Sequence, residues 1–230
     1  MPKVYCKNLL EIACFSFESC IKAQQFGADR IEFCTRYDLG GITPSDEDII
    51  RVKEQLHIPL HVIIRPRGGN FVYTTEEINE MKRAILFCKN HGIDGVVFGV
   101  LNDDYTINHT MNKELVELSK PMSTTFHRAI DDCTNSDEAF KRLIEIGFTR
   151  VLTSGAKEKA IEGISQLKML QHKFGKDIII MPGGGIRSSN IQKIVSQTQC
   201  IEYHSAAITN GAEQLNVSEL KNLKMTINKS

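Results

Sequence analysis

Short segments of apolar and β-branched residues recur along the chain at intervals of roughly 20 to 35 residues, and this spacing constrains the fold most. Eight of these segments are predicted to be β-strands, at 9–14, 30–34, 60–64, 95–98, 122–125, 150–153, 178–181 and 201–204. The stretches between them have the apolar spacing of helices that bury one face. Eight strands that alternate with helices predict an α/β fold, the TIM (β/α)8 barrel.

Capping residues mark several helix boundaries in the sequence. Ser16 and Ser45 are typical N-cap residues and open two of the amphipathic stretches. The helices with the clearest predicted limits span about 75–90, 136–146 and 160–174. Glycines that follow several of these stretches are expected to end the helices, because glycine readily adopts the left-handed conformation of a C-cap.

The segment after the eighth predicted strand fits the alternation least well. Residues 205–214 are predicted to form a loop and 218–225 a short helix, so the eighth helix is expected to be incomplete or displaced. We therefore expect the barrel at about 9–206, with a loop and a short helix in 207–230. No stretch rich in Pro, Gly or Ser separates two units, which predicts a single domain over 1–230.

The charge balance argues against several classes of partner. The 230 residues include 28 Lys and Arg and 28 Asp and Glu, which gives no electrostatic reason to bind nucleic acid or an anionic membrane. No apolar run is long enough to span a membrane, and the first residues lack the apolar core of a signal peptide, so a cytoplasmic protein is expected. The seven cysteines, irregularly spaced and without a CxxC pair, are expected to be reduced thiols.

Three consecutive glycines, Gly183, Gly184 and Gly185, follow the seventh predicted strand. Glycine lets backbone N–H groups point at an anion without a side chain in the way. The loop after the seventh strand of such a barrel often holds a phosphate. The next helix, with N-cap candidates at 188–190, is expected to add partial positive charge at its start.

Further candidates for anion binding follow other strands. Arg65 and Arg67 come after the third predicted strand, and His204 and Ser205 end the eighth. Polar residues at the carboxyl ends of barrel strands meet at one mouth, so we predict that these four bind an anion together with the glycine turn. The alternative is that the arginines lie on the surface of an ordinary turn.

Three residues are candidates for acid–base catalysis: Glu32 in the second predicted strand, and His127 and Arg128 at the end of the fifth. His127 is predicted to act as an acid, a base or an anion ligand. A carboxylate inside an apolar strand needs a partner, and for Glu32 we expect Arg128 or an arginine after the third strand. A general base, a metal ligand and a structural ion pair remain open for Glu32.

Cys14 and Cys34 end adjacent predicted strands. Neighbouring strands lie about 4.8 Å apart, so the two thiols are within reach of one metal ion. Soft sulfur ligands favour Cu(I), which makes this pair the candidate copper site. The alternative is that both residues are small members of the core.

Several motifs together resemble the copper homeostasis protein CutC family. They are LEIAC at 10–14, GADRIEFC at 27–34, GGITPS at 40–45, IRPRGGNF at 64–71, TFHRA at 125–129, VLTSG at 151–155, MPGGGI at 181–186 and EYHSA at 202–206. The resemblance covers about 9–206 and implies a cytoplasmic TIM barrel that forms homodimers or homotetramers. It also implies a role in copper homeostasis, with Cu(I) bound by Cys14 and Cys34.

Two functions are therefore predicted. The first is that of a Cu(I)-binding copper homeostasis protein. The alternative is an enzyme of lyase or isomerase type that acts on a small phosphorylated or carboxylated metabolite. In that enzyme Arg65, Arg67 and Arg128 would hold the anion with the glycine turn, and His127 and Glu32 would move protons. A non-catalytic scaffold is a third option.

Overall fold

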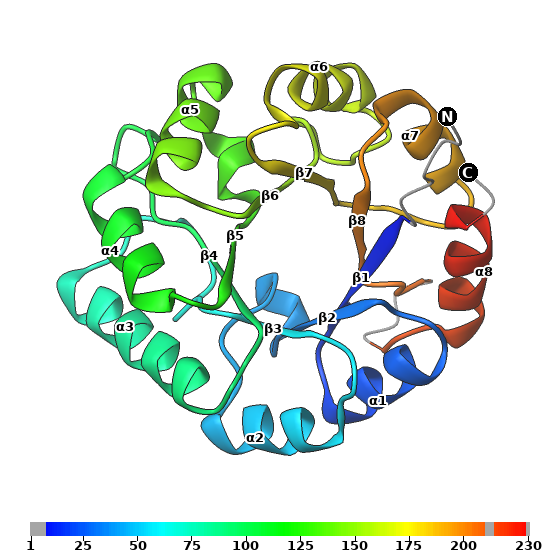
Figure 1. Cartoon of the computed structure of the whole chain (residues 1–230), viewed down its shortest axis with the longest axis horizontal. Helices are drawn as coiled ribbons and strands as arrows, with labels where there is room; N and C mark the ends of the chain where they lie inside the picture. The colour runs from blue at the N-terminus through cyan, green and yellow to red at the C-terminus, as the bar shows by residue number, and fades with distance from the viewer. Residues whose placement is uncertain (1–7, 210–213, 229–230) are drawn as a thin grey trace.

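The computed structural model describes residues 8–209 and 214–228. The eight strands are β1 (Leu9–Cys14), β2 (Arg30–Phe33), β3 (Leu60–Ile63), β4 (Gly95–Phe98), β5 (Ser123–Phe126), β6 (Arg150–Thr153), β7 (Ile179–Pro182) and β8 (Glu202–Ser205). They pair in parallel in the order β7-β6-β5-β4-β3-β2-β1-β8. β7 and β8, the two ends of this order, lie side by side, so the sheet curves into a nearly closed barrel (Figure 1). The predicted TIM barrel is confirmed.

The barrel has one seam, between β7 and β8. No backbone ladder joins these two strands, both of which are fully described. Instead, the hydroxyl of Ser205 at the end of β8 donates a hydrogen bond of 2.8 Å to the carbonyl of Ile186, in the loop after β7. This side-chain hydrogen bond at the rim therefore connects β8 to the loop after β7, although no backbone hydrogen-bond ladder joins the two strands.

The helices form a ring around the strands (Figure 1). They are α1 (Phe17–Gln25), α2 (Asp46–Gln55), α3 (Thr75–Asn90), α4 (His109–Ser119), α5 (Ser136–Ile146), α6 (Ile164–Phe174), α7 (Ile191–Thr198) and α8 (Val217–Ile227), with short 3-10 turns η1 (Tyr37–Leu39) and η2 (Arg128–Asp132). None of the described helices combines the length and the apolar character that crossing a bilayer requires.

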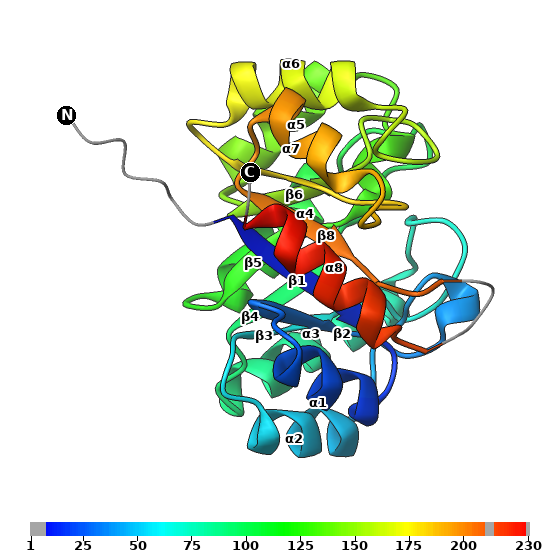
Figure 2. The same ribbon diagram turned by 90° about the vertical axis from the view of Figure 1, so that its right-hand side faces the viewer.

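The sequence favoured an incomplete or displaced eighth helix, but α8 takes its regular place in the ring. It lies between α7 and α1, and Figure 2 shows it in side view with α1 below and α7 above. Leu220, Leu223 and Ile227 form its buried face, with the spacing of one side of a helix. Residues 210–213, which belong to the loop predicted at 205–214, lie outside the described residues.

Local sequence explains where most helices begin. Ser16 and Ser45 accept hydrogen bonds from the backbone of the first turns of α1 and α2, as predicted. α3 begins with a capping box formed by Thr74 and Glu77. α6 begins at Ile164 and not at 160, because the Ala160 N–H donates to the carbonyl of Gly184 and ties the preceding turn to the loop after β7.

The inside of the barrel is polar, although the strands look apolar in the sequence. Alternate residues of each strand face the lumen, and four of these are buried charges of alternating sign: Glu11, Arg30, Glu202 and Arg150. Arg30 Nε bonds Glu11, Arg30 Nη2 lies 2.6 Å from Glu202 Oε2, and Arg150 Nε lies 3.0 Å from the same oxygen. Ion pairs thus connect the charged residues of the lumen, while most apolar strand residues face the helices.

Gly95 makes room for the buried ring of His61 in this lumen. A β-carbon at Gly95 would overlap the His61 imidazole. We expect Gly95→Ala to lower the free energy of unfolding by about 1–3 kcal/mol, because overpacking forces neighbouring groups to shift. Urea denaturation of the wild type, Gly95→Ala, His61→Ala and the double variant measures this. The two losses should be far from additive; additive losses would show that the contact does not matter.

Candidate functional site

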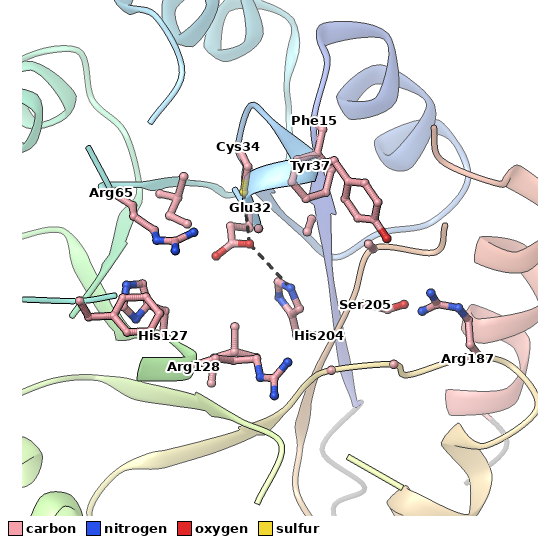
Figure 3. Close-up of a pocket in the computed structure, with 18 residues that line it drawn as sticks. Phe15, Glu32, Cys34, Tyr37, Arg65, His127, Arg128, Arg187, His204 and Ser205 are labelled. Atoms are coloured by element: carbon pink, nitrogen blue, oxygen red, sulfur yellow. Dashed lines mark hydrogen bonds and ion pairs between the residues drawn. The ribbon is translucent and has the colours of Figure 1, made fainter. Parts of the chain in front are cut away.

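A cavity of about 280 Å³ opens at the carboxyl ends of the strands (Figure 3). Most residues predicted for the site line this cavity: Glu32, Cys34, Arg65, His127, Arg128, Gly184, Gly185, His204 and Ser205. Cys14, Arg67 and Gly183 are not among the lining residues. The mouth predicted from the strand ends therefore gathers side chains from opposite sides of the barrel.

His204 lies in the cavity floor between two carboxylates. Its Nδ1 is 2.8 Å from Glu11 Oε1, and its Nε2 is 3.7 Å from Glu32 Oε2. Burial by itself raises the pKa of Glu11, but Arg30 and His204 outweigh it and hold that pKa well below its usual range. An ionised Glu11 can only accept, so His204 Nδ1 donates to it and Nε2 faces Glu32.

Glu32 has a different partner from the one predicted. No ion pair joins it to Arg65 or Arg128 within the described chain; its neighbours are His204 and the thiol of Cys34, whose Sγ lies 3.4 Å from Glu32 Oε2. Burial raises the pKa of Glu32. Burial lowers the pKa of His204, but the two carboxylates overcome this and raise it above its ordinary value. The two groups together form a buried acid–base pair that borders the cavity.

The glycine turn forms one wall of the cavity. The N–H groups of Gly184 and Gly185 donate to no acceptor within residues 8–209 and 214–228. Gly184 has a φ of +95°, and a β-carbon there would come within 3.1 Å of Arg128 Nη1, so the guanidinium packs closely against the backbone of this turn. This arrangement leaves backbone donors next to a cationic side chain, as an anion site requires.

Arg128 is held in place by a buried carboxylate. Its Nε lies 2.9 Å from Asp131 Oδ2, and its Nη2 donates to Ser154 Oγ at 2.9 Å. Asp131 also accepts from Thr153 Oγ1 at 2.6 Å, which joins the ends of β5 and β6. Because Asp131 neutralises it, Arg128 contributes donors to the cavity rather than net charge.

Arg187 is a lining residue that the sequence analysis did not single out, although it follows the glycine turn directly. Its Nη1 donates to the carbonyl of Ile186, and it pairs with no carboxylate of the described chain. Ser205 lies beside it on the same side of the cavity (Figure 3). Arg187 therefore supplies the unpaired positive charge of this side.

Two expected anion-binding features are used elsewhere. Arg67 Nε lies 2.6 Å from Glu77 Oε1, and Arg67 Nη2 donates to the carbonyl of Val72. Arg67 therefore stabilises the loop before α3 and is not a lining residue of the cavity. The N–H and hydroxyl of Ser188 are both bonded to Glu219 of α8. The carboxylate of α8 thus occupies the donors that were expected to face an anion ahead of α7.

The two predicted copper ligands have different surroundings. Cys34 faces the lumen and lines the cavity. Glu11 and Ala13 of β1 also face the lumen, so Cys14 points to the helix layer, where its thiol meets Cys20 of α1. Burial raises the pKa of both Cys14 and Cys34 well above the usual range. The end of β1 therefore contributes Ala13, not Cys14, to the cavity wall.

Comparison with known proteins identifies the family. The sequence model of the CutC family matches residues 8–209. The chain belongs to the CutC family. A human copper homeostasis protein cutC homolog is 41% identical to this CutC chain over 199 residues, which cover 86% of the chain and 73% of the relative. The resemblance drawn from the eight motifs is confirmed.

Two further relatives agree with this assignment. A family protein CutC of Parabacteroides distasonis is 42% identical over 202 residues, which cover 87% of this CutC chain and 83% of the relative. A Streptococcus agalactiae protein of known crystal structure, provisionally named copper homeostasis protein CutC, is 32% identical. It superimposes with a TM-score of 0.83 and covers 88% of this chain and 100% of its own.

Removing the charge of Glu11 tests the support beneath the cavity. We expect Glu11→Gln to lower the free energy of unfolding by about 3–5 kcal/mol at neutral pH, because Arg30 is left as a partly uncompensated buried cation. The depressed pKa of Glu11 stabilises the fold above the unfolded-state pKa near about 4.3 and loses that effect as pH falls. The difference between wild type and variant should therefore shrink below that pH. Urea denaturation between pH 3 and 8, run beside the surface variant Glu138→Gln, measures it.

Proposed function

We propose that this CutC family member is an enzyme of isomerase or lyase type that binds a small phosphorylated or carboxylated metabolite in the cavity. The observation that carries the proposal is the pairing of unused backbone donors at Gly184 and Gly185 with the guanidinium groups of Arg128 and Arg187. Donors of this kind are satisfied by an anionic oxygen. We also expect the protein in the cytoplasm and as a homodimer or homotetramer.

The charges around the cavity support an anionic ligand. Glu32 is balanced by His204, and Arg128 by Asp131. Arg65 and Arg187 form no ion pair with a carboxylate of the described chain, and both line the cavity. The cavity thus has a surplus of positive charge, although the whole chain is neutral.

The acid–base pair supports chemistry in addition to binding. Glu32 borders the cavity, and its raised pKa brings it closer to the range in which a carboxylate can exchange protons at physiological pH. His204 is anchored by Glu11 and, when protonated, balances the charge of an ionised Glu32. Proton transfer to and from a bound metabolite is therefore the role we assign to Glu32, with His204 as its partner.

The anion site can be tested with ethyl phosphate as the probe. Calorimetric titration should show binding to the wild type, weakened about tenfold in Arg187→Ala, because a hydrogen bond to a charged group contributes roughly 1.5–3 kcal/mol. Arg142→Ala, which changes an exposed arginine on α5, is the matched control and should bind like the wild type. The absence of any binding to the wild type in the millimolar range would contradict the proposal.

Copper binding is a second candidate function. The human relative is named a copper homeostasis protein. Cys20 and Cys34 lie close enough to Cys14 to contribute to its raised pKa, and Cys20 contributes likewise to the raised pKa of Cys34. The described residues contain no group of three or more His, Cys, Asp or Glu that could hold a metal ion. Two thiolates are enough for Cu(I), so this candidate depends on Cys14 and Cys34.

Copper binding should strengthen as the pH rises, because both buried thiols must lose a proton to the solvent. Each proton released gives about a tenfold gain in affinity per pH unit. Anaerobic Cu(I) titration against a chromogenic chelator measures this. Cys14→Ser and Cys34→Ser should each remove most of the affinity, whereas Cys133→Ser should not; equal binding by all three variants would exclude the thiol pair.

A further inference from the structure

Two buried polar groups of residues that line the cavity have no hydrogen-bond partner in the described chain. They are Nε2 of His127 and Nε of Arg65. The two residues are 5% and 6% exposed, and both line the cavity. The hydroxyl of Tyr73 lies close to the Arg65 guanidinium, whereas no described group accepts from His127 Nε2. An unsatisfied buried donor is costly, so His127 Nε2 at the cavity wall indicates that a ligand oxygen completes the site.

The backbone around His127 fixes which of its nitrogens carries hydrogen. The N–H of Ala129 donates to His127 Nδ1 at 3.3 Å, so Nδ1 is an acceptor and Nε2 is the donor. Burial, with the charge of Arg65 added to it, lowers the pKa of His127 to about 3. The imidazole is therefore neutral, and it offers one N–H that no described residue accepts.

Arg65 is a buried cation without a counter-ion in the described chain. Its Nη atoms donate to the carbonyls of Leu39, Gly41 and Gly69, at 2.8, 2.9 and 2.9 Å. These carbonyls satisfy hydrogen bonds and fix the loops after β2 and β3, but they do not neutralise the charge. A buried charge is expected to be paired, so this end of the cavity suits an oxygen that carries negative charge.

Figure 3 shows where these groups lie relative to the rest of the site. Arg65 and His127 lie on one side of the cavity, Arg187 and Ser205 lie on the opposite side, and Glu32 and His204 lie between them. The two cations without a carboxylate partner, Arg65 and Arg187, thus face each other across the acid–base pair. A ligand that bridges them needs an anionic or strongly polar oxygen at each end.

Building on the proposed function, we infer that the cavity has a second subsite, in which His127 Nε2 and Arg65 bind a carbonyl or carboxylate oxygen of the metabolite. The ligand class is therefore a small phosphate ester that also carries a carbonyl or carboxylate group. Its phosphate lies against Gly184, Gly185 and Arg187, and its other oxygen lies against His127.

This arrangement gives Glu32 a defined task. Glu32 takes the proton from the carbon next to the carbonyl, the electron pair of that C–H bond forms a carbon–carbon double bond, and the carbonyl oxygen receives the negative charge. His127 and Arg65 stabilise that oxygen, and a neutral imidazole is a suitable donor for it. In a ligand whose deprotonated carbon carries a hydroxyl group, that hydroxyl gives its proton to the other oxygen and Glu32 returns its proton to the former carbonyl carbon. The carbonyl group thereby moves by one carbon, an isomerisation that needs no added oxidant or reductant.

The test compares two probes by calorimetric titration: ethyl phosphate, and phosphoglycolate, whose planar carboxylate has the shape and charge of the anion formed in that step. We expect phosphoglycolate to bind the wild type at least about tenfold more tightly than ethyl phosphate. His127→Phe removes the N–H while keeping a ring of similar shape. It should abolish the advantage of phosphoglycolate and leave the affinity for ethyl phosphate unchanged.

The outcomes separate this inference from the proposed function. Equal binding of both probes to the wild type, or an advantage of phosphoglycolate that persists in His127→Phe, overturns the second subsite and leaves the phosphate site standing. Failure of both probes to bind overturns the proposed function itself. If His127→Phe does not fold, imidazole nitrogen NMR of the wild type replaces it: phosphoglycolate, but not ethyl phosphate, should shift the Nε2–H signal of His127.

Discussion

The alternating charges inside the barrel are the constraint on which the rest of the site depends. Arg30 bonds both Glu11 and Glu202, and Arg150 bonds Glu202, so each of these four charges has a partner in the low-dielectric lumen. Glu11 also accepts from His204, which fixes the ring at the floor of the cavity. The acid–base pair is thus connected through Glu11 to the ion pairs of the lumen.

The fold could be predicted from the sequence because each of its signals is local and repeated. The eight strands lie within one or two residues of their predicted positions, since buried parallel strands leave a short apolar run in the sequence. Most of the residues that line the cavity could also be predicted from the sequence. In this fold the carboxyl ends of all strands lie at one rim of the barrel, so polar residues at those ends come together. The order of the elements alone therefore brings His127 and His204 to the same cavity.

The differences from the sequence-based expectations concern the contacts that individual side chains make at that rim. The partner of Glu32 and the role of Arg67 depend on side-chain contacts with His204 and Glu77. The positions of the strands in the sequence do not predict such contacts. Cys14 ends its strand, but period-two alternation turns it toward the helices. Arg187 is not a strand residue at all, and only the path of the loop after β7 brings its guanidinium to the cavity.

The position of the cavity next to the seam between β7 and β8 connects ligand binding with the stability of the barrel. The glycine turn follows β7 and Ser205 ends β8, so two walls of the cavity belong to opposite edges of one open sheet. A ligand of the proposed class, bound between these walls, would contact both edges of the sheet. The binding free energy of such a ligand would add to the stability of the barrel at the seam, where no backbone ladder joins β7 and β8.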